Sequence, residues 1–200
     1  MDCGIWPSVI SGLVGGGLAL LGVYFTLKGH RQRDKDRQEE IIRGILQAIY
    51  EELKAMYDLL DSSAVELSWK AFENGPHPYY NFAIIFSKDY SIVFRSNANF
   101  IGQIKNSNIR HEIVKVYKVL DVIMGEYEKN TELLVRYIKA DKTGQRELAS
   151  ELYKQLRDFA PELQEMHEFS KKSIRNFLYM LEEEEEKESA KCSSERFWEQ

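Results

Sequence analysis

The chain has 200 residues, with 27 Lys or Arg against 32 Asp or Glu, so its formal net charge is −5. Duplex nucleic-acid binders carry a general excess of basic residues, so we expect no duplex nucleic acid among the partners. The two cysteines, Cys3 and Cys192, lie at opposite ends of the chain and exclude a disulfide framework and a cysteine zinc site.

An uncharged apolar run occupies residues 5–27, and a basic stretch from Lys28 to Arg37 follows it directly. A helix rises about 1.5 Å per residue, so this run is long enough for a bilayer core of about 30 Å. Positive charge after the run, rather than before it, argues against a signal peptide. The same charge predicts that the N-terminus lies outside and the rest lies in the cytoplasm. The sequence therefore predicts a transmembrane anchor at 1–28 in the inner (cytoplasmic) membrane, passing once.

A stripe of small residues follows one side of this expected helix. Such stripes let transmembrane backbones approach closely, and Gly12 with Gly16 forms a GxxxG match. Glycine is also common in membrane helices generally, which is the plainer explanation. We predict that the segment is a self-association surface and that the protein is a homo-oligomer. The predicted oligomerisation residues are Ser8, Gly12, Gly15, Gly16, Ala19 and Gly22.

Helical periodicity dominates the next part of the chain. Apolar residues recur at steps of three or four from Ile41 to Leu60, which predicts a helix over about 34–61. A short helix is expected at 64–73, ended by the turn residues 74–78. The aromatic and β-branched segment 79–94 predicts irregular structure or short strands.

Three further helical segments follow, at 96–104, at 109–140 and, after a turn at 142–144, from Leu148 to Leu181 through Pro161. The acidic run that begins at Glu182 predicts a solvated helix end and a disordered acidic tail at 188–200. The predicted fold is therefore all-α, with one N-terminal transmembrane helix followed by an antiparallel helical bundle. The cytoplasmic helical domain is expected to span 29–187.

Motifs of known catalytic chemistry are absent from the sequence. There is no GxxxxGK[ST] loop, no GxGxxG after a strand, no HExxH, no GxSxG and no CxxC, and the four histidines are scattered. The sequence therefore predicts that the protein is not an enzyme, and it indicates neither a cofactor nor a metal site.

One segment, from Phe94 to Lys118, is dense in cations and amides, and its first acidic residue is Glu112. Arginine binds phosphate in a bidentate fashion, and asparagine reads purine edges, so the segment suits a phosphorylated ligand such as a cyclic oligonucleotide. The alternative is that the amides are helix caps and the cations form a solvated helix face. The candidate ligand-binding residues are Arg95, Asn97, Asn99, Lys105, Asn108, Arg110, His111 and Lys115.

The same segment carries a loose resemblance to known proteins. Its pattern reads Phe94, Asn97, Ile101, Gly102, Ile104, Ile109, Ile113, Val114 and Tyr117. This pattern resembles a group of uncharacterised bacterial proteins with an N-terminal membrane helix, a basic exit and a helical cytoplasmic domain. The layout is also similar to that of small CRISPR-associated membrane effectors. The resemblance implies assembly through the N-terminal helix and, for some members, a response to cyclic oligoadenylate.

Two functions are compatible with these observations. In the first, the protein is a membrane-embedded antiviral effector, in which the helical domain senses a ligand and the assembled membrane helices perturb the bilayer. In the second, it is a non-enzymatic membrane anchor or scaffold for a cytoplasmic protein partner. Gene neighbourhood would distinguish the two functions, because adjacency to phage-defence genes would favour the first.

Overall fold

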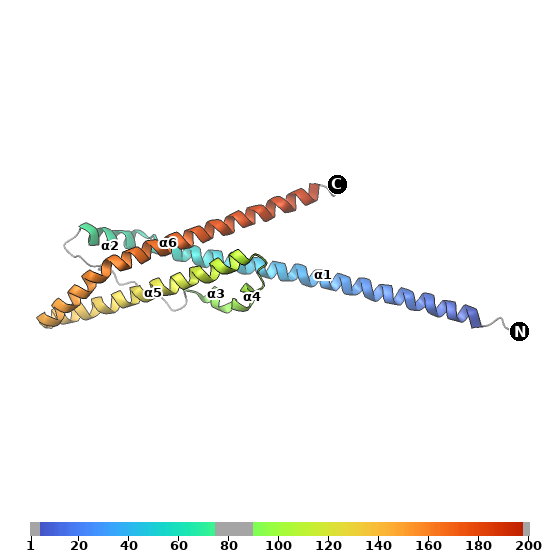
Figure 1. Ribbon diagram of the computed structural model, residues 1–200, viewed down its shortest axis with the longest axis horizontal. Helices are drawn as coiled ribbons and strands as arrows, with labels where there is room; N and C mark the ends of the chain where they lie inside the picture. Colours follow the sequence, from blue (N-terminus) through green and yellow to red (C-terminus); the bar gives the residue numbers. More distant parts are fainter. Residues whose placement is uncertain (1–4, 75–89, 198–200) are drawn as a thin grey trace. The chain divides into compact units, whose positions relative to one another are not determined.

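The computed structural model describes residues 5–74 and 90–197, and within them the side chains of residues 23–70, 90–187 and 190. Over these ranges the chain is helical and has no strand, which confirms the all-α prediction. The helices are α1 (Ile5–Leu60), α2 (Ser63–Asn74), α3 (Ile92–Ser96), α4 (Ala98–Ile101), α5 (Ser107–Lys142) and α6 (Arg146–Phe197) (Figure 1). The segment 79–94, predicted to be irregular or strand-like, lies outside the described residues up to 89, and residues 92–94 belong to α3.

The predicted transmembrane anchor is not supported. No helix in the described part of the chain has a stretch that is long and apolar enough to cross a membrane. This finding contradicts the anchor at 1–28, the single-pass topology and the inner-membrane localisation. The helix itself continues through the basic stretch as far as Leu60.

The chain divides into two compact units, Met1–Gly44 and Ile45–Gln200. In the first unit, the described side chains from 23 to 44 are exposed, apart from half-buried Gly29 and Ile42. Ile41, which the periodicity assigned to the buried stripe, is exposed as well. The packed core of the protein therefore lies in the second unit.

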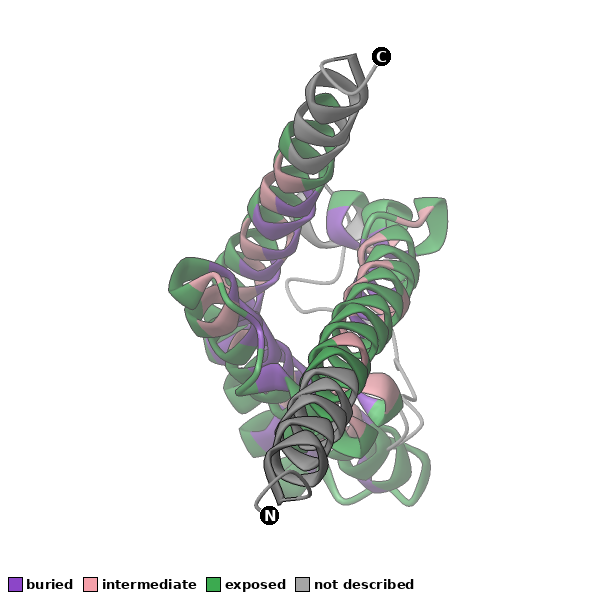
Figure 2. Ribbon diagram, turned by 90° about the vertical axis from the view of Figure 1, so that its right-hand side faces the viewer, coloured by how far each residue is buried: buried purple, intermediate pink, exposed green. Residues whose placement is uncertain are grey.

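The core of the second unit is formed by single faces of its long helices. The last turns of α1 bury Ile49, Leu53 and Leu60, and α5 and α6 each bury a stripe along one side (Figure 2). Apolar spacing of three and four residues puts these side chains on one face, so each helix packs mainly through apolar groups. The buried polar residues of α5 and α6 are Asn130, His167 and Ser170. The buried residues of α5 are Ile109, Ile113, Val116, Tyr117, Leu120, Ile123, Met124, Tyr127, Asn130, Leu134 and Ala140.

Helices α5 and α6 form an antiparallel hairpin, as the sequence predicts for its consecutive long helices (Figure 1). Gly144 has a φ of 71°, and its N–H donates to the Asp141 carbonyl at 3.1 Å, while the Gln145 N–H donates to Ala140 at 3.0 Å. These two bonds form a Schellman motif, which satisfies the last carbonyl groups of α5. The backbone of α6 is helical as far as Phe197, past the start of the predicted tail at 188.

Two residues of the predicted α6 stripe do not lie in the core. Leu148 and Phe169 are 42% and 52% exposed. The buried positions around Phe169 are His167 and Ser170, and one helical residue turns by about 100°, so Phe169 lies beside the core rather than in it. An apolar residue at nearly the right spacing was therefore assigned to the wrong face.

Candidate functional site

The predicted ligand-binding residues are spread over several short elements of the second unit. Arg95 lies on α3, and Asn97 and Asn99 lie at the start of α4. Lys105 lies in the connection that leads to α5. The other four residues, Asn108, Arg110, His111 and Lys115, lie on the first turns of α5.

Arg110 is bound to the backbone of its own segment. Its guanidinium donates to the carbonyl oxygen of Ile104 and, at 3.3 Å, to that of Lys105. Asn106 caps the same helix, since its side-chain oxygen accepts from the N–H groups of Asn108 at 3.0 Å and Ile109 at 3.4 Å. Arg110 and Asn106 therefore fix the turn into α5.

The amides of the predicted patch also make local contacts. The side chain of Asn97 donates to the Val93 carbonyl at 2.8 Å, and the carbonyl of Asn99 accepts from the Gln103 side chain at 3.4 Å. These contacts are typical of helix ends and turns. They match the alternative that the sequence left open, in which the amides of this segment have local structural roles.

The remaining cations do not join Arg110. Arg95 lies 3.9 Å from Asp121, and Asp121 is eleven residues after Arg110, which is about 16 Å along α5. Lys115 is paired with Glu112 at 3.0 Å, and His111 is exposed. The structure therefore brings Arg110 to the Lys105 carbonyl, but it places Arg95 beside Asp121, away from Arg110 and Lys105. Ligand binding by the predicted residues stays a prediction.

The predicted oligomerisation stripe lies on the backbone of α1. The structure describes only the backbone at these positions, so their role in self-association stays a prediction. The stripe consists of Ser8, Gly12, Gly15, Gly16, Ala19 and Gly22.

A carboxylate that the sequence analysis did not single out connects three helices. Glu52 of α1 accepts hydrogen bonds from the N–H groups of Val93 at 2.8 Å and Phe94 at 3.4 Å, and from the hydroxyl of Tyr117. The Phe94 and Tyr117 rings stack with centroids 4.1 Å apart. Burial, and then the bond to Glu52, raise the pKa of Tyr117 above its usual range. In the sequence, Glu52 lies between Ile49 and Leu53 of the apolar stripe. A charged residue at such a position could have indicated that its carboxylate has a buried partner.

A second tyrosine attaches the same segment to α5. The hydroxyl of Tyr90 donates to Asp121, and the Arg95 guanidinium lies 5.9 Å from the centre of the Tyr90 ring. Burial and this hydrogen bond raise the pKa of Tyr90 to about 12. Arg95 and Asp121 thus act here in holding the segment from Tyr90 to Asn97 against the bundle.

A buried polar cluster joins α2, α5 and α6. The His167 Nδ1 atom lies 2.7 Å from the Tyr127 hydroxyl, and its ring lies 5.7 Å from that of Trp69. Burial, and then the charge of Lys171, lower the pKa of His167 to about 4. Lys171 itself binds Asp61 at 2.6 Å. The imidazole is therefore neutral near pH 7, and the cluster serves to pack three helices together.

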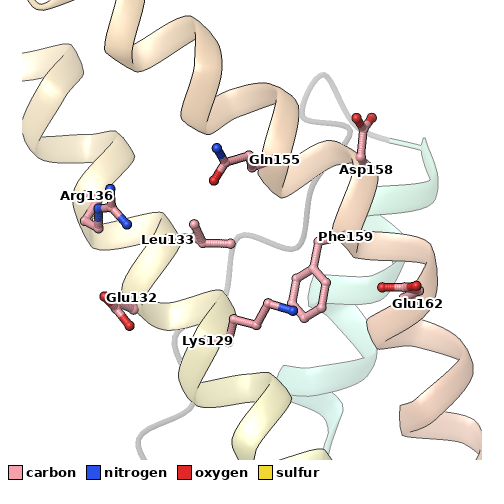
Figure 3. Close-up of a pocket in the computed structure, with 8 residues that line it drawn as sticks. All are labelled: Lys129, Glu132, Leu133, Arg136, Gln155, Asp158, Phe159 and Glu162. Carbon is pink, nitrogen blue, oxygen red and sulfur yellow. The ribbon is translucent and has the colours of Figure 1, made fainter.

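A shallow groove runs between α5 and α6 (Figure 3). The Lys129 ammonium lies 4.2 Å from the centre of the Phe159 ring across it. Its other charged groups are of both signs, with Arg136 and Glu132 on α5 and Asp158 and Glu162 on α6. Such a mixture does not concentrate one charge, and the described residues include no group of His, Cys, Asp and Glu that suits a metal ion. The groove therefore resembles a solvated helix–helix surface more than a small-molecule site.

The end of the hairpin, residues 131–157, differs from the rest of the bundle, and we call it the distal hairpin. Its core clusters contain residues of α5 and α6 only: Leu134 packs with Leu156, and Ala140 packs with Ala149 and Leu152. Val135 and Ile138 of α5 are 58% and 39% exposed.

No family model, curated protein or solved structure matches this chain. The resemblance to CRISPR-associated membrane effectors therefore stays a prediction.

Proposed function

We propose that the protein is a non-enzymatic scaffold that holds an acidic protein partner on its distal hairpin. The observation that supports this proposal is an apolar stripe on α5 that continues beyond the part of α5 packed beside α1. Val135 lies 18 residues after Tyr117, and Ile138 lies 18 residues after Leu120. Eighteen residues make five helical turns, so each pair lies on the same side of α5.

The two ends of this stripe differ in what covers them. Tyr117 is bound to Glu52 of α1, and both Tyr117 and Leu120 are buried. Helix α1 ends at Leu60, and Val135 and Ile138 are exposed. The exposed apolar residues at this end of α5 have the same helical spacing as the residues of α5 that are buried beside α1. Such a face is a suitable docking surface for another helix.

The charge of the distal hairpin indicates the kind of partner. Residues 131–157 contain six Lys and Arg against four Asp and Glu, in a chain that is acidic overall. All six bases are exposed. Complementary charge guides encounter and selects partners, so we propose a partner that offers acidic residues around an apolar helix face.

The effector function is not carried further in its predicted form, because it required a membrane-spanning helix. The sensing half of that hypothesis does not depend on a membrane.

Photo-crosslinking tests the scaffold function. A benzophenone amino acid at Val135 should crosslink a defined acidic partner in cells, and the double variant Val135→Glu and Ile138→Glu should lose that partner in co-purification. The matched control is Val114→Glu with Val122→Glu, on the same helix and exposed to a similar extent. Equal crosslinking from Val122 and Val135, or equal loss in both double variants, would contradict the proposal.

A further inference from the structure

The outward face of α6 carries bases and acids in an ordered arrangement. Between Lys154 and Glu186, α6 exposes four bases and eight acids, and four of these acids are placed along the helix as counterparts of the four bases. The bases are Lys154, Arg157, Lys172 and Arg175, and the four counterpart acids are Glu165, Glu168, Glu183 and Glu186. These residues belong to one continuous helix within the second unit.

The arrangement is antisymmetric about Ser170, so that each base on one side of this residue matches an acid on the other. Glu168 and Lys172 lie two residues on either side of Ser170, and Glu165 and Arg175 lie five residues on either side. The same relation holds further out for Arg157 with Glu183 and for Lys154 with Glu186. An antiparallel helix pair with a two-fold axis at this position places every one of these bases opposite an acid of the other copy.

Apolar side chains occupy the remaining outward positions in a compatible way. Phe169 is 52% exposed and lies one residue from the level of the axis, about 100° around α6 from the buried Ser170, so the two copies of this ring would lie along the same edge of the pair. Tyr179 is exposed, and Pro161 lies at the same distance on the other side of Ser170. Each tyrosine ring would therefore lie against the proline of the other copy, which removes apolar area from water at three points along the pair.

One like-charged pair arises in this register, between Asp158 and Glu182. Glu182 accepts from the Tyr50 hydroxyl at 2.6 Å, and Asp158 binds Arg157 at 2.8 Å within one chain. Arg157 would therefore be shared between Asp158 and Glu183 of the other copy, and Glu183 is also paired with Lys187 at 3.6 Å. The bond to Tyr50 directs Glu182 toward α1 and away from the outward face. This pair therefore does not oppose the arrangement.

We propose that two copies of the chain associate through the outward face of α6, antiparallel, with the two-fold axis at Ser170. A two-fold interface uses the same patch on both copies, so it must be complementary to itself, and the order of charges on α6 meets that condition. Single exposed ion pairs are weak and are screened by salt. Association therefore depends on the whole set and weakens as salt is raised.

Charge reversal of the full-length chain tests the proposal. Sedimentation in low salt should show a dimer for the wild type. Glu165→Lys with Glu168→Lys should weaken association by at least about tenfold, and so should Lys172→Glu with Arg175→Glu. The quadruple variant should dimerise again, and an equimolar mixture of the two double variants should form a heterodimer. These residues are exposed, so circular dichroism should remain unchanged.

Disulfide crosslinking tests the position of the axis, in a background with Cys3→Ser and Cys192→Ser. Phe169→Cys lies one residue from the level of the axis, so it should crosslink to its own copy more readily than a cysteine placed further out along α6. Lys154→Cys should not crosslink to itself, but it should crosslink to Glu186→Cys in a mixture. A monomeric wild type, a dimer that survives both reversals, or self-crosslinking at Lys154→Cys in place of Phe169→Cys would overturn the proposal.

Discussion

The bundle beside α1 and the distal hairpin share two helices and differ in a third. Leu120 and Ile138 lie on the same side of α5, five turns apart, and their exposed fractions are 0% and 39%. The amphipathic pattern continues through both regions. The difference shows that the stripe defines a face that is able to pack, and that a covering helix decides whether the face is buried.

The two regions also differ in their polar contacts. Beside α1, side chains far apart in sequence meet, as Glu52 meets Tyr117 and Tyr127 meets His167. In the distal hairpin, the Gln155 side chain donates to Glu151 of the same helix at 3.2 Å.

The largest expected difference between the regions is the cost of removing an apolar side chain. Leu120→Ala should lower the free energy of unfolding by about 3 kcal/mol, because it leaves a cavity in a fully buried site. Ile138→Ala should lower it by less than about 1 kcal/mol. Chemical denaturation of both variants measures the difference, and equal losses would show that the distal face is as well covered as the core.

The buried His167 should make stability depend on pH. Its pKa is lowered to about 4 in the folded chain, against an ordinary value near 6.5. The unfolded chain therefore takes up a proton first, so this contribution is complete above about pH 6.5 and is lost as pH falls toward 4.

Between about pH 7 and pH 5, the loss should be about 2 kcal/mol. His167→Gln should remove this part of the pH dependence, and the control His111→Gln, at an exposed position, should keep it. Denaturation curves at several pH values measure the effect. An unchanged pH dependence in His167→Gln would contradict the neutral, buried state of this ring.

The hydrogen bonds of Glu52 should contribute less than the apolar core but more than surface contacts. Glu52→Gln should cost about 2 kcal/mol, because the amide is uncharged and accepts fewer of the three donors. Glu51→Gln is the matched control, since Glu51 is exposed and pairs only locally with Gln47 at 3.0 Å. Thermal unfolding compares the two variants. A similar small change in both would mean that Glu52 does not hold the segment from Tyr90 to Asn97.

The end of the hairpin should respond to a change in backbone freedom. Gly144→Ala should destabilise by about 1 kcal/mol, because the φ of 71° is unfavourable for alanine. Gly125→Ala lies in the middle of α5 with nothing near its added Cβ, and it should stabilise by up to about 1 kcal/mol. The two variants should therefore shift the melting temperature in opposite directions.

The smallest expected effect on stability comes from the predicted ligand residues that do not brace the backbone. Arg95→Ala with Lys115→Ala should cost only about 0.5 kcal/mol, since both ion pairs are exposed. If the patch binds a cyclic oligoadenylate, calorimetry of the full chain should show binding that this variant loses and that salt weakens. No heat from the wild type across a panel of such nucleotides would contradict the sensing function.

The sequence by itself determined the helical class, the long helices and most of their buried faces. Ile49, Leu53, Leu120 and Leu163 recur at helical spacing, and all four are buried. Local rules were sufficient there because periodicity and turn residues act within a few residues of each other. The same rules led to the transmembrane anchor, which the described part of the chain contradicts.

Only the tertiary structure decided which faces are covered and which polar residues meet. Phe169 fitted the stripe by spacing but lies on the exposed side of α6, and Arg110 looked available for a ligand but binds the carbonyls before its own helix. Glu52 gained its role from Val93, Phe94 and Tyr117, which lie 41 to 65 residues away. Such contacts depend on where separate helices pack together, and no pattern local to one helix contains that information.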